Sequence, residues 1–237
     1  MLNMTNTLLL VVWTALLFEP LARAFVPSAP WSTSIATPNR LPVQHATLDR
    51  NTDASPTIWT QEQLEDYANK QGVILSLTTL GPAYRAIARP KHNQTKILGY
   101  VEGFVRPTGN LLHVDKMEVF RKIVKQTREE NPDFKGGGTS LGVGLLMGFL
   151  CMLHGQEKGC RSAEFLAIDD EDRQHKRLVR YYKSAGFDFI KYVGDDFKDI
   201  PDRMVWGGCG TLLRKDIPSL LAYWTRLMEK SLQDKTF

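Results

Sequence analysis

The glycine-rich stretch from Gly136 to Gly144 is the part of this sequence whose residue types most clearly suggest chemistry. It reads Gly-Gly-Gly-Thr-Ser-Leu-Gly-Val-Gly and leads into an apolar run from Leu145 to Leu153. Glycines allow backbone N–H groups to approach phosphate oxygens without obstruction by a Cβ, and a following helix adds the positive end of its dipole. The pattern therefore predicts either a phosphate-binding loop at a helix N-terminus or a flexible surface loop before a core helix.

A second group of reactive side chains lies upstream, in the strand expected over residues 111–119. Side chains alternate between the two faces of a strand, so we expect His113, Asp115 and Met117 to share one face. The even-numbered positions from Val114 to Glu118, which include a lysine, would share the other face. Either face is a candidate to meet a substrate.

A third feature is a basic amphipathic segment that ends in Tyr181-Tyr182-Lys183-Ser184-Ala185-Gly186-Phe187. Acidic residues at 169–171 suit a helix N-terminus, and Arg177 and Arg180 suit the later turns. Helical spacing places one buried stripe along this segment, made of Leu178, Val179, Tyr182 and Ala185.

A glycine-rich loop, a buried helix, a short strand and a helix ending in Tyr-x-x-x-Gly-Phe, in this order, resemble the cofactor half of the GNAT superfamily of acyl-CoA N-acyltransferases. The family pattern Arg/Gln-x-x-Gly-x-Gly/Ala falls on Thr139 to Gly144, which keeps both glycines but has a threonine at the first position. The resemblance implies acetyl-CoA as co-substrate and no metal. It also implies a binding set for the donor: Gly137, Gly138, Thr139, Gly142, Val143, Gly144 and, on the later helix, His175.

The resemblance further implies roles for two side chains. Tyr182 would be the general acid that protonates the departing thiolate; the alternative is a core aromatic whose hydroxyl bonds to the backbone. Glu118 would be the base by its position, since the family often places a glutamate or an ordered water there. The strand that carries Glu118 is expected to splay and to offer backbone N–H groups to the thioester oxygen. His175 falls where the family often has an asparagine, and its alternative is a solvated surface histidine.

The function expected from this resemblance is transfer of an acetyl group from acetyl-CoA to a primary amine, either of a small molecule or of a protein lysine or N-terminus. Thr139 in place of Arg or Gln, an inserted stretch from Arg121 to Phe134 and the undecided base favour an alternative. That alternative is a non-catalytic GNAT-fold subunit that works as an interaction module.

The order of elements indicates an α/β (α+β) fold: a GNAT-like mixed, largely antiparallel twisted sheet flanked by helices on both faces. A helix with a capping box at Thr60 and Gln63 is expected first, followed by strands at 73–80, 84–88, 97–105 and 111–119. Behind the glycine-rich stretch we expect a helix at 141–158, a strand at 164–168, a helix to 185, strands at 187–193 and 204–213, and a last helix from Asp216.

Three connecting stretches leave alternatives open. Residues 121–134 predict an extra helical turn that forms a lid or a partner surface, or else a solvated excursion. The four aspartates between Gly194 and Arg203 would attract a cationic amine or would cap a connection between two strands. The three glycines between Trp206 and Gly210 predict a bulge or a close approach of backbones.

The N-terminus predicts targeting. The apolar run Leu8 to Phe18 is too short to span a bilayer, and Ala22-Arg23-Ala24 suits cleavage, so residues 1–24 are expected to be a signal peptide. Residues 25–55 begin with Phe25, lack acidic residues as far as Leu48 and are rich in Ser, Thr and Pro. They resemble the transit segment of the bipartite plastid presequences of algae such as diatoms. The alternatives are a retained anchor or a buried N-terminal helix for the first segment, and a disordered linker after a signal peptide for the second. Residues 56–237 would form a single GNAT-like domain.

Composition narrows the partners. The formal charge is only +4, and no lysine or arginine run is joined by exposed aromatics, so we expect no nucleic-acid partner. After cleavage no further membrane segment is expected. The three cysteines, Cys151, Cys160 and Cys209, have no paired spacing, which favours the reducing plastid stroma over the extracellular space.

Overall fold

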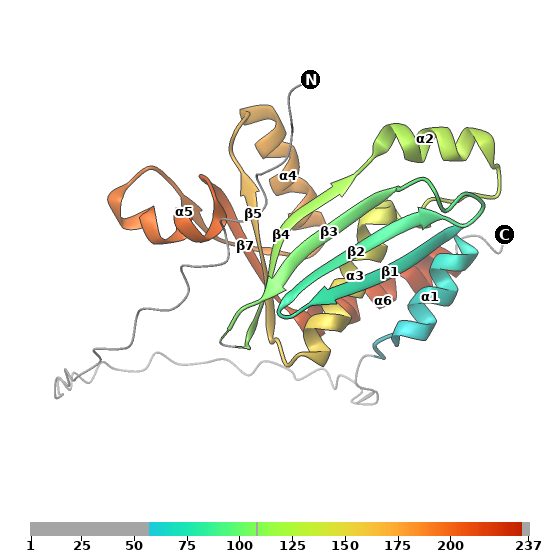
Figure 1. The fold of residues 1–237 in the computed structure, drawn as a ribbon, viewed down its shortest axis with the longest axis horizontal. Coiled ribbons are helices and arrows are strands. Elements are labelled where there is room, and N and C mark those ends of the chain that lie inside the picture. Colours follow the sequence, from blue (N-terminus) through green and yellow to red (C-terminus); the bar gives the residue numbers. More distant parts are fainter. Residues whose placement is uncertain (1–56, 108, 234–237) are drawn as a thin grey trace, which may run out of the picture. The chain divides into compact units, whose positions relative to one another are not determined.

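The computed structural model describes residues 57–107 and 109–233, which form one seven-stranded mixed sheet with helices packed against it (Figure 1). The strands follow the order β1-β2-β3-β4-β5-β7-β6, and every neighbouring pair except β4 and β5 is antiparallel. The predicted fold class, a mixed and largely antiparallel sheet with flanking helices, is confirmed. The predicted signal peptide and transit segment lie outside the described residues.

The first half of the domain follows the sequence prediction closely. Helix α1 (Gln61–Lys70) begins with the expected capping box: Gln63 N donates to Thr60 Oγ1 at 3.3 Å, and Thr60 N donates to Gln63 Oε1 at 2.9 Å. An antiparallel meander comes next, made of β1 (Val73–Leu80), β2 (Ala83–Pro90), β3 (Gly99–Val105) and β4 (Leu111–Val119).

The second half begins with α2 (Arg121–Glu130), which occupies most of the inserted stretch, and α3 (Gly142–Glu157). Strand β5 (Ser162–Ile168) then pairs parallel to β4. Helix α4 (Asp172–Ser184) leads to the edge strand β6 (Asp188–Val193). The chain continues through a short 3₁₀ helix, η1 (Phe197–Asp199), and α5 (Ile200–Trp206). It then returns as β7 (Gly210–Asp216) between β5 and β6 and ends in α6 (Ile217–Gln233).

The prediction of a strand at 204–213 is wrong over its first half, where the chain forms α5. Pro201 lies in the first turn of this helix, and Gly207 ends it in the left-handed region with φ of 73°. Met204 and Val205 suggested a strand by residue type, yet their side chains are 80% and 48% exposed. The expected close approach of backbones does occur at Gly210, where an added Cβ would overlap Ala167 O.

Helices cover both faces of the sheet. Helices α1, α3 and α6 lie together on one face of β1–β4 (Figure 1), which explains why α3 is apolar nearly all round. Helix α4 packs on β5 and β7 in the same layer, where Trp224 Nε1 of α6 donates to Ala185 O at 2.7 Å. Helix α5 lies on the opposite face, where Trp206 stacks on His113 of β4.

A β-bulge in β4 corrects the predicted assignment of its faces. Glu102 pairs with Lys116 and Gly103 pairs with Val114, so Asp115 is an extra residue with no partner in β3. The alternation therefore shifts by one position after Asp115. Met117 joins Val114 on the face that packs against α3, whereas Glu118 falls on the face that carries His113.

Candidate functional site

The site is built around a split between β4 and β5. The two strands pair only from Leu111 with Ser162 to Val114 with Phe165, although β4 continues to Val119 and β5 to Ile168. The bulge at Asp115 bends β4 just where this pairing ends. The splay that was expected for this strand is confirmed.

Backbone donors of β4 face this split. Phe120 N donates to Leu98 O at 2.8 Å, so alternation along an antiparallel pair directs Glu118 N–H toward β3 as well. The N–H group of Met117 then points the other way, toward the split. A carbonyl oxygen placed in the split could accept a hydrogen bond from it.

Tyr182 of α4 lies beside the split. Its side chain is 7% exposed, and its ring stacks on Phe165, at the last β4–β5 pair, with centroids 4.7 Å apart. Burial raises the pKa of Tyr182 well above its usual value, and neighbouring Tyr181 adds to this shift. The hydroxyl therefore stays protonated at neutral pH, as a proton donor must.

A small apolar cavity, lined in part by Met117, Tyr181, Tyr182 and Gly144, lies next to the split. Its volume is only ≈ 10 Å³, about the least space that can hold one water molecule. The side chains of the two helices and of β4 therefore fill the position next to the splayed strands.

Tyr181 closes this cavity toward the start of α3. Its hydroxyl donates to Leu141 O at 3.4 Å, and a Cβ at Gly144 would overlap that hydroxyl. The pattern of the sequence singled out Tyr182 and left Tyr181 as packing or surface. The structure shows that Tyr181 packs against Gly144, which is the one glycine of the predicted loop that lines the cavity.

The predicted phosphate loop is divided in two. Gly136, Gly137 and Gly138 have φ of 66°, 103° and 74°, which only glycine adopts readily, and they pack against the end of α1. Gln71 O accepts the N–H of Gly136 at 3.3 Å, and Tyr67 Oη donates to Gly137 O at 3.3 Å. This half is thus neither a flexible surface loop nor an open cradle.

The other half of the loop is better placed for a ligand. Gly142, Val143 and Gly144 form the first turn of α3, and Gly144 borders the cavity. The hydroxyl of Thr139 is buried and makes no hydrogen bond to any described residue. An orphaned hydroxyl beside the first turn of a helix suits a phosphate oxygen, so this half fits the phosphates of acetyl-CoA.

His175 lies against the sheet and is not a solvated surface residue. Its Nε2 is 3.1 Å from Thr211 Oγ1 of β7, its Nδ1 is 3.5 Å from Asp169 Oδ1, and its side chain is 12% exposed. These partners join the start of α4 to β7. Its predicted contact with the donor stays a prediction.

Glu118 lies on the opposite face of the sheet from Tyr182. Tyr100 Oη donates to Glu118 Oε2 at 3.0 Å, Lys116 Nζ is 3.3 Å away, and the carboxylate side chain is 42% exposed. A base and an acid on opposite sides of the split can serve the two ends of a transfer reaction. The catalytic roles of both residues stay predictions.

The face that carries Glu118 also holds a buried ion network, which sequence patterns did not predict. Glu164, which pairs in register with His113, has a side chain only 3% exposed. Arg214 Nε donates to Glu164 Oε1 at 2.5 Å, and Arg106 Nη2 is 3.3 Å from Oε2. A single glutamate at the start of an apolar strand and two distant arginines show no spacing that would reveal this contact.

The acidic connection between β6 and β7 is internally paired. Asp195 receives a hydrogen bond from Arg203 Nη1 at 2.8 Å, and Asp199 accepts Gly194 N at 3.1 Å. Asp196 lies 3.1 Å from Lys198 Nζ, and Asp202 bonds to Lys191. Of the two alternatives, these contacts favour a capped connection over a site for a cationic amine.

Within residues 57–107 and 109–233, no three His, Cys, Asp or Glu side chains gather where they could hold a metal ion. The helices of the same residues include none with the length and apolar character needed to cross a membrane.

Comparison with known proteins gives similarity at the level of solved structures only. No protein-family model matches the sequence, and no curated protein matches it. An acetyltransferase of the GNAT family from Staphylococcus aureus Mu50 shares 16% identity over 66% of this chain and 75% of its own, with a TM-score of 0.38. The aminoglycoside 6′-N-acetyltransferase from Enterococcus faecium shares 8% identity over 59% and 77%, with a TM-score of 0.36.

A further match is an aminoglycoside 6′-N-acetyltransferase complexed with coenzyme A. It shares 9% identity over 57% of this chain and 73% of its own, with a TM-score of 0.36. At these identities and TM-scores, the similarity does not assign the chain to a family.

Proposed function

We propose that this protein transfers an acetyl group from acetyl-CoA to a primary amine. The observation that carries the proposal is the split between β4 and β5, which has a buried tyrosine hydroxyl on one side and a backbone donor on its edge. Tyr182 and the N–H of Met117 are the groups that acyl transfer from a thioester requires near the reacting carbonyl.

The chemistry assigns one task to each group. The amine nitrogen forms a bond to the thioester carbon while the carbon–sulfur bond breaks. Met117 N–H stabilises the negative charge that develops on the carbonyl oxygen. Glu118 takes the proton that the amine nitrogen releases, and Tyr182 gives its proton to the departing thiolate. Solvent then returns a proton to Tyr182 and accepts the one on Glu118, so atoms and charges balance.

The donor would be held at the start of α3 by the Thr139 hydroxyl and by backbone N–H groups of Gly142 to Gly144. Because the adjoining cavity holds only ≈ 10 Å³, a pantetheine arm requires the side chain of Tyr181 or Met117 to change rotamer. The acceptor would approach from the face of Glu118, whose carboxylate is within reach of solvent.

We further propose that the acceptor is a small amine or a protein lysine or N-terminus, and that the reaction takes place in a plastid. The support for the plastid is the presequence pattern before residue 56, and the support for the amine is the resemblance that the sequence carries.

A calorimetric titration of the purified protein with acetyl-CoA tests the proposal. The parent should bind, and Gly144→Asp should bind at least about tenfold more weakly because a carboxylate would enter the apolar cavity beside Tyr181 and Met117, where the donor arm would lie. Gly144→Ala is the matched control, since it adds the same Cβ beside Tyr181 without the charge. A screen of polyamines, lysine peptides and amino acids for release of thiol from acetyl-CoA would then identify the acceptor.

A second candidate is a non-catalytic subunit that serves as an interaction module. The filled cavity between Tyr181 and Met117 favours it, because a side chain already occupies the position a donor arm would need. Absence of acetyl-CoA binding in the titration would select this candidate.

A further inference from the structure

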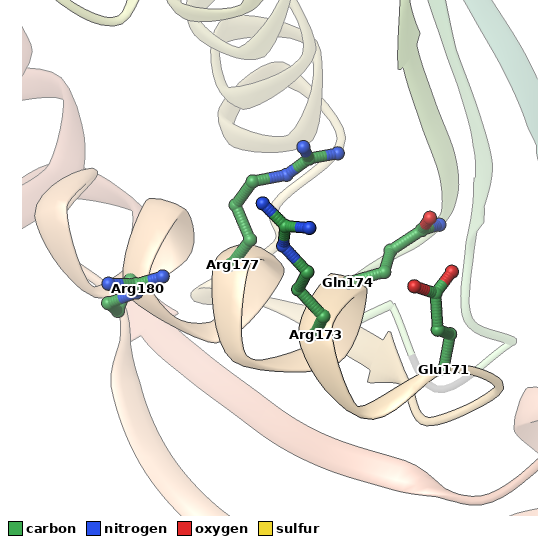
Figure 2. Close-up of a pocket in the computed structure, with 5 residues that line it drawn as sticks. All are labelled: Glu171, Arg173, Gln174, Arg177 and Arg180. Atoms are coloured by element: carbon green, nitrogen blue, oxygen red, sulfur yellow. The ribbon is translucent and has the colours of Figure 1, made fainter.

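The outer surface of α4 carries a basic hollow of ≈ 510 Å³. It is lined by Glu171, Arg173, Gln174, Arg177 and Arg180. Figure 2 shows Arg173 and Arg177 extending side by side from the helix, with Gln174 and Glu171 nearer its N-terminal end. Three guanidinium groups thus share the hollow with a single carboxylate.

The charge of these arginines is not compensated within the described part of the chain. No carboxylate oxygen of a described residue lies within 4.0 Å of Arg173, Arg177 or Arg180. Lys176 of the same helix differs from them, since its Nζ pairs with Asp172 Oδ2 at 2.7 Å. Like charges held together without a counter-ion attract an anion.

The hollow lies on the same helix as Tyr181. Arg177 precedes Tyr181 by four residues and Gln174 precedes it by seven, so the three side chains lie along one face of α4. Tyr181 in turn bonds to Leu141 O, where α3 begins. The pKa of Tyr181 is raised by burial and lowered by the charge of Arg121, so the first residue of α2 adds another cation beside this tyrosine.

We propose that this hollow binds phosphate groups of the acyl-CoA donor, with Arg177 as the principal ligand. This phosphate site rests on the proposed function. It supplies the long donor side chain that the glycine-rich stretch lacks. Thr139 stands where a long donor side chain is expected, and the backbone of Gly136 and Gly137 is engaged by α1. A guanidinium group binds phosphate through two parallel hydrogen bonds, which a threonine hydroxyl does not match.

Binding of coenzyme A without any acyl group tests this site, because no turnover is needed. Arg177→Gln should weaken the affinity for coenzyme A by about tenfold and should flatten its dependence on salt concentration. Lys176→Gln is the matched control: it removes a neighbouring positive charge that already has a partner, and it should change the affinity by less than about twofold. Thermal denaturation should show both variants folded, since both side chains are at the surface.

Two further ligands locate the phosphate and separate the possible failures. If Arg177→Gln weakens coenzyme A but not dephospho-coenzyme A, the hollow holds the 3′-phosphate; equal weakening assigns it to the diphosphate. Equal binding of coenzyme A by the parent and Arg177→Gln would overturn this site and leave the proposed function standing.

Adenosine 3′,5′-bisphosphate is the second of these further ligands. If the parent binds it through Arg177 but does not bind coenzyme A, the anion site stands and the proposed function fails. If the parent binds neither ligand, both are overturned.

Discussion

The imidazole of His113 lies face to face with the indole of Trp206, with ring centroids 3.8 Å apart and planes 20° apart. Phe104 stacks on the other side of the imidazole at 4.3 Å, so His113 is fully buried. Neither ring nitrogen makes a hydrogen bond to a described residue, although Asp115 Oδ1 lies 3.9 Å from Nε2. Because His113 lies one residue before the last β4–β5 pair, this stack fixes α5 beside the split.

His113→Phe should leave the protein folded and should raise its free energy of unfolding by about 1 kcal/mol at neutral pH. The aromatic stack would remain, and two buried nitrogens without partners would be removed. Urea denaturation measures this, with Phe104→Ala as a variant that breaks the stack and should destabilise. A loss of stability in His113→Phe would mean that the ring nitrogens have a partner.

The same substitution should raise the pKa of Asp115. The adjacent imidazole of His113, whose Nε2 lies 3.9 Å from Asp115 Oδ1, lowers this pKa, while partial burial opposes the shift. A depressed carboxyl pKa stabilises the fold above the unfolded-state value, and this contribution is lost as the pH falls through the folded-state value. The parent should therefore lose stability in acid more steeply than His113→Phe, and carboxyl NMR titration would report the pKa directly.

Stability should fall in alkali because of buried tyrosines. Burial raises the pKa of Tyr84, Tyr181 and Tyr182. Their neutral forms stabilise the fold in full below the unfolded-state pKa of about 10, and this contribution declines as the pH rises from there toward the folded-state values. Urea denaturation between pH 8 and pH 11 should show this decline, and Tyr182→Phe should make it shallower. A flat profile in the parent would contradict the burial of these hydroxyls.

Gly144→Ala and Tyr181→Phe should be coupled in stability. In the parent, the new methyl would overlap the Tyr181 hydroxyl and force that ring away from Leu141 O, which should outweigh the roughly 1 kcal/mol that alanine adds to a helix. Once Tyr181→Phe removes the hydroxyl, Gly144→Ala should become stabilising. A double-mutant cycle by thermal or urea denaturation measures the coupling, and strict additivity would show that the two positions do not touch.

Tyr182→Phe should lower kcat by roughly 100-fold or more while the affinity for acetyl-CoA stays near that of the parent. The substitution removes only a hydroxyl from a ring that is held by Phe165, so the fold should be retained. Tyr181→Phe is the matched control, because it deletes the neighbouring hydroxyl, which bonds to the backbone. Equal turnover by the parent and Tyr182→Phe would reject the acid role.

Residues 1–55 fused to a fluorescent protein should direct it to the plastid of a diatom. Replacing Phe25 with a small polar residue should leave the reporter outside the stroma, since Phe25 directly follows the expected cleavage site. Fluorescence microscopy provides the measurement. Secretion of the unmodified fusion into the medium would contradict the plastid proposal.

Local signals in the sequence were sufficient for most elements. The capping box at Thr60 and Gln63 fixed the start of α1, and the apolar run after Gly144 correctly predicted the buried helix α3. Each signal depends on residues within a few positions of one another, where propensity and periodicity act. The seven strands were likewise found, with the largest error at the segment that became α5.

The arrangement of the site depended on contacts that no local pattern encodes. The bulge at Asp115 arises from the pairing of β3 with β4, and it moved Met117 to the core face. The packing of Gly137 and Gly138 against α1 joins residues about 70 positions apart, as the bond from Tyr67 to Gly137 shows. The sequence could therefore nominate Tyr182 and the glycines, but it could not show that, of the glycines from 136 to 144, Gly144 alone borders the cavity.

The extra residue in β4 also determines which changes of chain length the domain can accept. Deleting Asp115 would restore regular pairing with β3, and because Lys116 would then follow Val114 directly, Met117 and Glu118 would keep their present faces. What the deletion would remove is the bend that the extra residue introduces where β4 parts from β5. The core should thus tolerate the loss of this one residue, whereas the site would lose the splay that opens β4 away from β5.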